Sequence, residues 1–191
     1  MKKTITLILV IATFCVQAQT KDAALNKRLD EYLGYSKTLN IDLLLNYMYP
    51  KVFEVASKAQ IKKALEAAYN NADLKISLDS ISIGTILPIE KFTTGAFTKF
   101  DYNVKMIITL ATKEYQDKKE RISENFKTKF GKENVVFNSE INTFYIYQTK
   151  QALAIKDNFS KNIWTFMGIE EDSKALTKII PLAIKKKYEI N

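Results

Sequence analysis

The amino-acid sequence predicts an α+β domain in which N-terminal helices pack on a strongly curved antiparallel sheet, a cone, with a crossover helix and a C-terminal helix. Apolar residues recur at helical spacing in the first part of the chain, and from Leu74 onward they alternate with a period of two. A charged helical segment interrupts the alternating stretches. Helices grouped before strands are typical of α+β domains, whereas α/β folds alternate the two.

Two helices are expected before residue 50. Residues 22–37 form an amphipathic helix whose apolar positions are Leu25, Leu29, Tyr32 and Leu33. Asn40 is placed to cap a short apolar helix from Ile41 to Met48, which Pro50 ends. Both helices have an apolar side that can pack against a sheet.

A third helix is predicted to begin after Ser57. Ser57 and Gln60 have the spacing of a capping box, in which the two side chains bind each other's backbone N–H groups. The positions expected to be buried by this helix are Ile61, Ala64, Leu65 and Ala68.

The first strands carry an irregularity that the sequence locates. Residues 74–78 alternate with one parity and residues 81–83 with the other, so the slip at Asp79-Ser80 predicts a β-bulge. Thr98 to Leu110 alternates most regularly, and its partly polar second face is typical of an antiparallel sheet packed on one side. A turn containing Gly95 joins the two strands.

The second half of the sheet is expected after a crossover. Lys113 to Lys129 is charged throughout and predicts a solvated helix over one end of the sheet, which Gly131 ends. Strand character resumes in Val135 to Phe137, Ile141 to Tyr147, Ala152 to Ile155 and Ile163 to Gly168. Because Phe144 to Tyr147 is apolar on both faces, we expect a central strand covered on both sides.

The C-terminal tail is expected to be helical in two parts. Ser173 is placed as the cap of the first part. The second starts at Pro181, a residue that suits a first helical turn, and Lys185 to Lys187 fall in its last turn, where positive charge complements the helix dipole.

The N-terminus has the features of a cleaved signal peptide. Two lysines precede an apolar run from Ile5 to Val16, and Ala18 marks a cleavage site before Gln19. A run of about twelve residues is too short to cross a bilayer, which takes roughly twenty. Phe14 argues against lipidation at Cys15. We therefore expect residues 1–18 to be removed and residues 19–191 to form one exported domain, periplasmic or secreted, without a membrane span.

The composition excludes several kinds of chemistry. The chain has no histidine, so catalytic triads and histidine metal sites are excluded. Its only cysteine falls in the predicted leader, and its five glycines are at least eleven positions apart, so no dinucleotide or P-loop motif exists. We expect no cofactor and no metal. The acidic run Glu170 to Asp172 is interpreted as a helix start, because it lacks the alternating ligands of a calcium loop.

The charge is basic but is carried by lysine. Loss of the leader, which has two lysines and no acidic residue, would lower the formal net charge from +8 to +6. Only Arg28 and Arg121 are arginine, whereas nucleic-acid readers depend on that side chain, so no nucleic-acid partner is expected. The lysines are interpreted as a solvated surface, with weak attraction to anionic cell surfaces as a minor alternative.

Residues 22–110 contain two helices, the turn from Tyr47 to Phe53, a third helix and bulged strands, in that order. In this the chain resembles the nuclear transport factor 2-like, or cystatin-like, superfamily of α+β cones. It also resembles small exported bacterial proteins without an assigned activity, which share a Tyr-Pro-x-x-Phe turn and a strand like Ile163 to Phe166. The crossover helix and the two-part tail depart from the minimal cone.

The resemblance implies a concave pocket that serves for isomerisation, dehydration, ligand binding or docking. Related isomerases use a carboxylate base with tyrosine and protonated aspartate donors, which needs no histidine. The candidate site residues are Asp101, Tyr102, Tyr145, Tyr147 and Trp164. Each has an alternative interpretation, as a solvent-facing carboxylate for Asp101 and as core aromatics for the others.

Two functions remain open on the sequence. The first is a non-catalytic exported module that holds a small apolar ligand or a protein partner. The second is an acid-base enzyme, of isomerase or dehydratase type, that uses Asp and Tyr in the pocket and requires a buried carboxylate of raised pKa. The first is preferred because so few catalytic residue types are present.

Overall fold

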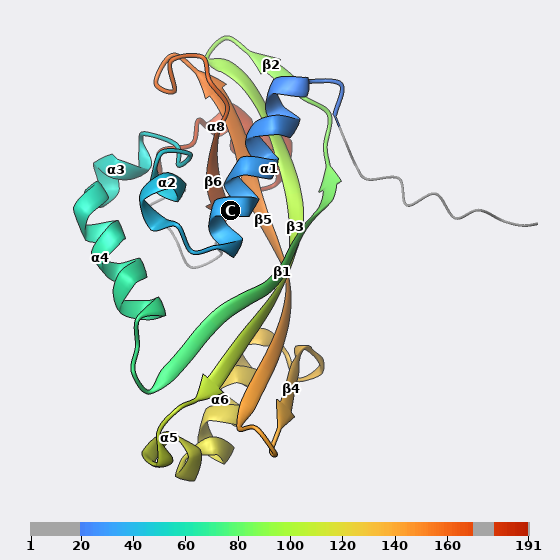
Figure 1. The fold of residues 1–191 in the computed structure, drawn as a ribbon. Coiled ribbons are helices and arrows are strands. Elements are labelled where there is room, and N and C mark those ends of the chain that lie inside the picture. The colour runs from blue at the N-terminus through green and yellow to red at the C-terminus, as the bar shows by residue number, and fades with distance from the viewer. Residues whose placement is uncertain (1–19, 170–177, 191) are drawn as a thin grey trace, which may run out of the picture.

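A computed structural model describes residues 20–169 and 178–190 and has the predicted α+β class (Figure 1). Its helices are α1 (Ala23–Lys37), α2 (Ile41–Leu45), α3 (Val52–Val55), α4 (Lys58–Tyr69), α5 (Lys113–Asp117), α6 (Lys119–Phe130) and α8 (Leu182–Tyr188), with the 3-10 turn η1 (Lys132–Asn134). Its strands are β1 (Leu74–Ile86), β2 (Glu90–Phe92), β3 (Gly95–Leu110), β4 (Val135–Asn138), β5 (Thr143–Asp157) and β6 (Thr165–Ile169). The predicted leader and the predicted cap Ser173 lie outside the described residues.

The strands form one open, antiparallel, six-stranded sheet. Its order is β1-β3-β5-β4, with β2 beside β3 and β6 beside β5. The register of β1 against β3 shifts between Leu78 and Ser80, which confirms the predicted bulge. Within the described residues, no helix is long and apolar enough to cross a membrane.

β5 is one strand of 15 residues, whereas two separate stretches were predicted. The polar segment between them, Gln148 to Gln151, pairs with Val104 to Asp101 of β3. Thr149 donates a hydrogen bond to Asn103 Oδ1 (2.8 Å), and Gln151 donates one to Asp101 Oδ1 (3.0 Å). Cross-strand polar pairs of this kind allow a strand to continue where one of its faces meets water.

α1 agrees with the prediction, and α2 is shorter than predicted. Asn40 caps α2 as expected, but the helix ends at Leu45 instead of Met48. The following segment runs beside β6: the Tyr49 N–H donates to the Phe166 carbonyl (2.8 Å), and the Phe166 N–H donates to the Tyr47 carbonyl (2.8 Å). These bonds to the sheet compete with further helical turns.

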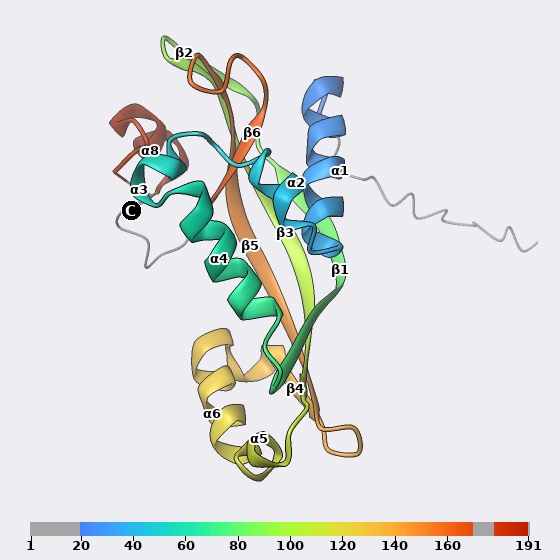
Figure 2. The ribbon, with the colours of Figure 1, turned by 60° about the vertical axis from the view of Figure 1, so that its left-hand side comes forward.

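The capping box of α4 is present, but the predicted buried stripe is wrong. The Ser57 side chain accepts from Gln60 N–H and the Gln60 side chain accepts from Ser57 N–H. No residue of α4 is buried, and Ala64 and Ala68 are exposed. The helix lies to one side of the sheet in both views (Figure 1, Figure 2) and is linked to α2 by an ion pair from Lys62 to Asp42 (2.6 Å).

The charged crossover runs from the end of β3 past β5 to β4, as two helices where one was predicted. α6 is less solvated than expected, because its aromatic residues pack on the lower half of the sheet. Phe126 meets Phe144 edge to face, with ring centroids 5.1 Å apart. Gly131, at φ 91°, ends α6 as predicted.

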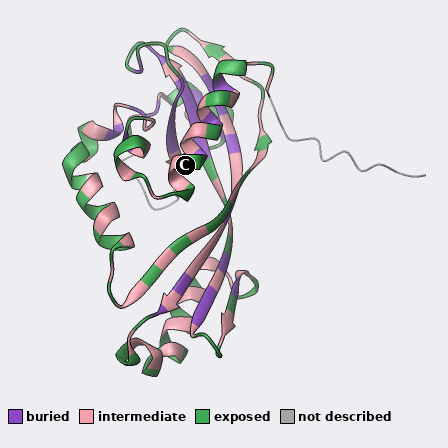
Figure 3. Ribbon diagram, viewed as in Figure 1, coloured by how far each residue is buried: buried purple, intermediate pink, exposed green. Residues whose placement is uncertain are grey.

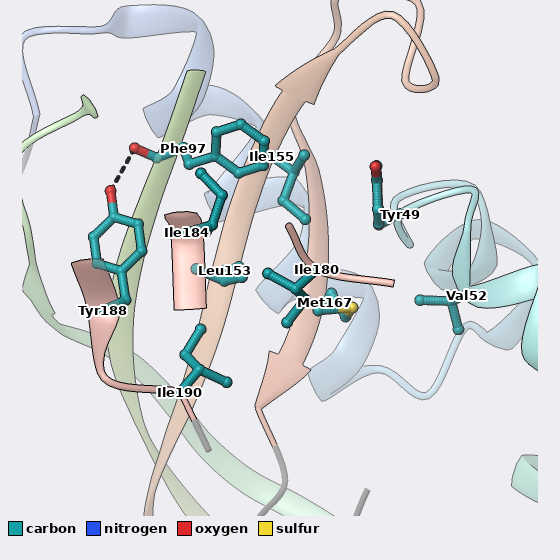
Figure 4. Packing of buried hydrophobic residues seen from close by; sticks show 10 residues of the cluster. All are labelled: Tyr49, Val52, Phe97, Leu153, Ile155, Met167, Ile180, Ile184, Tyr188 and Ile190. Atoms are coloured by element: carbon teal, nitrogen blue, oxygen red, sulfur yellow. Dashed lines mark hydrogen bonds between the residues drawn. The ribbon is translucent and has the colours of Figure 1, made fainter. Parts of the chain in front are cut away.

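The upper half of the sheet in Figure 1 is covered on both faces. Ala152 and Ala154 of β5 pack toward α1, and the alternate residues Leu153 and Ile155 pack toward α8 (Figure 3, Figure 4). α8 follows Pro181 as predicted, and the Tyr188 hydroxyl donates to the Phe97 carbonyl (2.8 Å).

The lower half is covered on one face only. Phe144 and Ile146 are buried beneath α6, but Tyr147 is 45% exposed on the other face. The strand is central, as predicted, while its expected cover on both sides is wrong. The tyrosine rings tolerate this position because their hydroxyl groups can remain in water.

Candidate functional site

A cleft at the upper end of the molecule is called the upper cleft here. It has a volume of about 1100 Å³. Residues that precede α1, the segment Ile86 to Ile89, the β2 hairpin, Lys156 of β5 and the approach to β6 form its walls. Three regions that are distant in sequence, near residues 20–22, 86–96 and 156–164, therefore converge on one cavity.

The floor of the upper cleft is apolar and is anchored to the core. Trp164 is 2% exposed and packs with α1, and Ile86, Ile89 and Ala96 pack against the same cluster. The Trp164 Nε1–H donates to Asp22 Oδ2 (3.2 Å), while Asp22 Oδ1 caps α1 by accepting from Leu25 N–H (2.9 Å). The carboxylate of the cleft is therefore already bound to the protein.

Three lysines line the same cleft. Lys21 and Lys91 are exposed, and Lys156 is half-buried with its Nζ 5.8 Å from the centroid of the Trp164 ring. Among the described residues, no ion pair involves any of these three ammonium groups. The cleft thus combines an apolar floor with the positive charge of three lysines.

A second cleft, the central cleft, lies on the sheet face between α1, α2 and α6. It has a volume of about 870 Å³, and Tyr102, Val104 and Met106 of β3 form its floor. Lys129 and Lys150 contribute positive charge, and no aspartate or glutamate of the described chain lines it. This cleft lies between helices and sheet, where the family resemblance implies a pocket, but no candidate base among the described residues lines it.

The predicted site residues do not converge. Trp164 lines the upper cleft and Tyr102 lines the central cleft. Asp101 alternates with Tyr102 along β3, so it lies on the other face of the sheet, where it accepts a hydrogen bond from Gln151.

Tyr145 and Tyr147 lie on that same open face and line neither cleft. Lys105 Nζ is 5.2 Å from the ring centroid of Tyr145 and 6.0 Å from that of Tyr147. Lys105 also pairs with Asp79 across the bulge, at 2.9 Å. The two tyrosines therefore belong to a polar and aromatic surface.

Sequence reasoning missed the buried carboxylate of Asp157. Its Oδ2 accepts from the Tyr49 hydroxyl (2.7 Å) and its Oδ1 accepts from the Ser160 N–H (2.8 Å). Desolvation raises the pKa of Tyr49, and the hydrogen bond to Asp157 adds to this. The spacing Asp157-x-x-Ser160 at a strand end was the available signal. Both carboxylate oxygens of Asp157 accept hydrogen bonds, and the residue lies in neither cleft. It therefore holds the end of β5 in place against Tyr49 and Ser160.

Tyr47 is likewise held by its surroundings. Its hydroxyl donates to Glu31 Oε2 (2.9 Å), and the guanidinium of Arg28 lies 4.1 Å from its ring centroid. Burial raises the pKa of Tyr47 to about 12, and the bond to Glu31 contributes. Tyr47 is therefore a structural tyrosine.

Sequence reasoning also missed Lys91 and Lys156 as cleft residues, although the apolar run Ile86 to Ile89 was a signal for this wall. In the described part of the chain, no three acidic side chains come together in a way that could hold a metal ion.

The sequence matches no protein-family model and no curated protein at a significant level.

Proposed function

We propose that the protein is an exported, non-catalytic binding module whose upper cleft holds a small apolar molecule with an acidic group. The observation that carries the proposal is the combination of an apolar floor at Trp164 with the lysines Lys91 and Lys156 in one cleft. An amphipathic anion has an apolar part for the floor and a negative charge for the lysines.

The size and lining of the cleft support this class of ligand. Small-molecule sites are concave, mostly apolar, and contain a few polar groups that fix orientation, with volumes of roughly 300 to 1,000 Å³. At about 1100 Å³ the upper cleft has room for a single acyl chain or a ligand of similar size. Because Asp22, the one carboxylate that lines the cleft within the described residues, already binds Trp164, the local charge favours anions.

The acid-base alternative has less support. It requires a carboxylate near a tyrosine hydroxyl inside a pocket, and the pairs described above with this geometry, Asp157 with Tyr49 and Glu31 with Tyr47, lie outside both clefts. Asp101 faces away from the central cleft, and its partner is an amide. A protein partner, in place of a small ligand, is the alternative if the experiments below find no small molecule in the cleft.

Trp164 is the only tryptophan of the chain, so its fluorescence reports directly on the upper cleft. We expect dodecanoate, below its critical micelle concentration, to change the emission in a saturable way. Dodecyl trimethylammonium, with the same tail and the opposite charge, should bind at least about tenfold more weakly, because one charge-assisted hydrogen bond contributes about 1.5 to 3 kcal/mol.

A matched pair of lysine variants tests the charge. Lys156→Met should weaken dodecanoate binding roughly tenfold, whereas Lys132→Met, on η1 at the opposite end, should leave it unchanged. If dodecanoate and its cationic analogue bind equally well, the proposal that the ligand carries an acidic group is refuted. If neither changes the emission, and native mass spectrometry of the protein from its own cells shows no small co-purifying mass, the cleft is not the ligand site.

We further propose that the chain belongs to the nuclear transport factor 2-like superfamily, with a cone-like sheet, and that it is exported through the inner membrane after loss of residues 1–18. The order of N-terminal helices and bulged antiparallel strands supports the family. The charged and apolar N-terminus supports export. Cell fractionation with N-terminal sequencing of the mature protein should give Gln19 as the first residue, and a chain that starts at Met1 would contradict this.

A further inference from the structure

Two large apolar side chains protrude from the upper end of the molecule, on the loop that joins β5 to β6. Phe159 is 57% exposed and Ile163 is 48% exposed. The loop projects beside the β2 hairpin in both views (Figure 1, Figure 2). Because water solvates such side chains poorly, two of them on one loop fit contact with another apolar medium where their surroundings also favour it.

The loop is held in this conformation by several bonds. The Asn162 N–H donates to the Asp157 carbonyl (2.7 Å), and the Ile163 N–H donates to the Ser160 carbonyl (3.1 Å). Lys161 and Asn162 adopt φ values of 54° and 57°. These values lie in the left-handed region, which residues other than Gly, Asn and Asp rarely adopt. The backbone of the loop that carries Phe159 and Ile163 is therefore held in place.

Lysines surround this tip. Lys51 Nζ lies 3.8 Å from the ring centroid of Phe159, and Lys161 is on the loop itself. Lys21, Lys91 and Lys156 line the adjoining upper cleft, which Asn162 of the same loop borders. Among the described residues, none of these five ammonium groups takes part in an ion pair.

We propose that this end of the molecule docks on an anionic phospholipid surface, with Phe159 and Ile163 at headgroup depth and the lysines on the lipid phosphates. Basic residues around a few apolar anchors are the combination that binds such a surface. A soluble polyanion would satisfy the lysines but would leave both apolar side chains in water. The lipid surface satisfies both.

Docking in this orientation turns the upper cleft toward the membrane, because Asn162 belongs to both the docking loop and the cleft wall. An amphipathic anion could then pass between lipid and cleft without crossing water. This consequence rests on the proposed function, whereas the docking itself rests only on the loop and its lysines.

The docking is tested by co-sedimentation of the mature chain, residues 19–191, with lipid vesicles. We expect binding to vesicles of equal parts phosphatidylcholine and phosphatidylglycerol, and at least about tenfold weaker binding to phosphatidylcholine alone. Added salt should weaken the binding, because the Debye length shortens. Equal binding to the two kinds of vesicle, or binding to neither, would overturn the proposal.

Paired variants separate the two contributions. Phe159→Ser with Ile163→Ser should weaken binding at least about fivefold through lost apolar burial, and Lys51→Gln with Lys161→Gln by about fivefold for each lysine. The matched control is Val136→Ser with Ile141→Ser, which removes side chains of similar exposure, 52% and 53%, from the opposite end. Thermal unfolding of each variant establishes that it is folded.

Further results distinguish docking through this loop from other ways of binding. If the serine variants at the loop bind vesicles like the unchanged chain, or the control pair loses binding equally, docking through this tip is refuted. If heparin binds the chain as tightly as the anionic vesicles do, and the loop serines leave both unchanged, the lysines bind polyanions. Dodecanoate titration of Trp164 without vesicles tests the proposed function separately.

Discussion

Gly95 occupies a position that no other residue fits without movement of the backbone. Its φ is 146°, a conformation that residues with side chains rarely adopt. A β-carbon there would lie 2.5 Å from the carbonyl oxygen of Lys156 and 2.7 Å from the Asp157 Cβ. The missing side chain allows β3 to approach β5 at the wall of the upper cleft.

Gly95→Ala should therefore lower the free energy of unfolding by at least about 2 kcal/mol, because both strain and overlap are introduced. Urea denaturation followed by circular dichroism measures this. Gly34→Ala is the control: apart from its chain neighbours and the backbone of α1 itself, no atom lies within 4 Å of the added carbon, and α1 should gain roughly 0.5 to 1 kcal/mol. A stable Gly95→Ala protein would show that the hairpin is free to move away.

Single residues of the site were only partly predictable. Trp164 was a candidate for the concave pocket that the family resemblance implies, and it lines the upper cleft instead of the central one. Lys91 and Lys156 look like surface lysines in the sequence. Their shared position depends on the pairing of the β2 hairpin through β3 with β5, which local patterns do not contain.

At the scale of elements, Asp22 connects helix α1 to the approach of β6. One carboxylate oxygen caps the helix through Leu25 N–H (2.9 Å), and the other accepts from Trp164 Nε1–H (3.2 Å). One residue thus positions both the start of α1 and the indole that forms the floor of the upper cleft.

Asp22→Ala should lower the free energy of unfolding by about 1 to 2 kcal/mol, through the lost cap and the unpaired indole N–H. The Trp164 emission should change with it. Asn40→Ala removes a cap from the five-residue helix α2 and should cost about 0.5 kcal/mol without any change in emission. An unchanged spectrum for Asp22→Ala would contradict the assigned contact to the indole.

Elements whose signals are local were predicted well. The capping box at Ser57, the bulge after Leu78 and the end of α6 at Gly131 each depend on a few neighbouring residues, and all three are confirmed. The continuity of β5 depends on β3 beside it, and the burial of α4 depends on where that helix lies. Both expectations failed because tertiary contacts decided them.

Two tyrosines with a raised pKa lie on opposite faces of the sheet, so their ionisation affects the stability of the packing on both faces. Tyr47 packs on the α1 side and Tyr188 on the α8 side. Burial raises the pKa of each to about 12 from an ordinary value of 10.0. Hydrogen bonds to Glu31 and to the Phe97 carbonyl hold the two hydroxyl protons.

The free energy of unfolding should therefore fall as the pH rises from 10 toward 12. In that window the unfolded chain loses these two protons and that of Tyr49, whereas the folded chain keeps them, so alkali favours unfolding. Below pH 10 the full stability is present. Urea midpoints at several pH values, with tyrosinate absorbance, measure this. Tyr47→Phe with Tyr188→Phe should show a shallower slope, and an identical slope would contradict the assignment.

The whole-molecule class, α+β with an antiparallel sheet and a crossover helix, followed from the order of periodicities along the sequence. The division of the sheet into an upper half covered on both faces and a lower half covered on one did not. It depends on α8, a short tail helix that packs against residues as distant in sequence as Phe97. The upper cleft arises at the edge of that covered half.

The bulge in β1 has a further consequence for the protein in a crowded compartment. β1 is the outer strand of the sheet for all of its 13 residues, and an outer strand presents backbone groups to which another chain can add. The shift after Leu78 interrupts that row, and the ion pair from Asp79 to Lys105 places charge beside it. A long strand is thereby made a poor template for edge-to-edge aggregation.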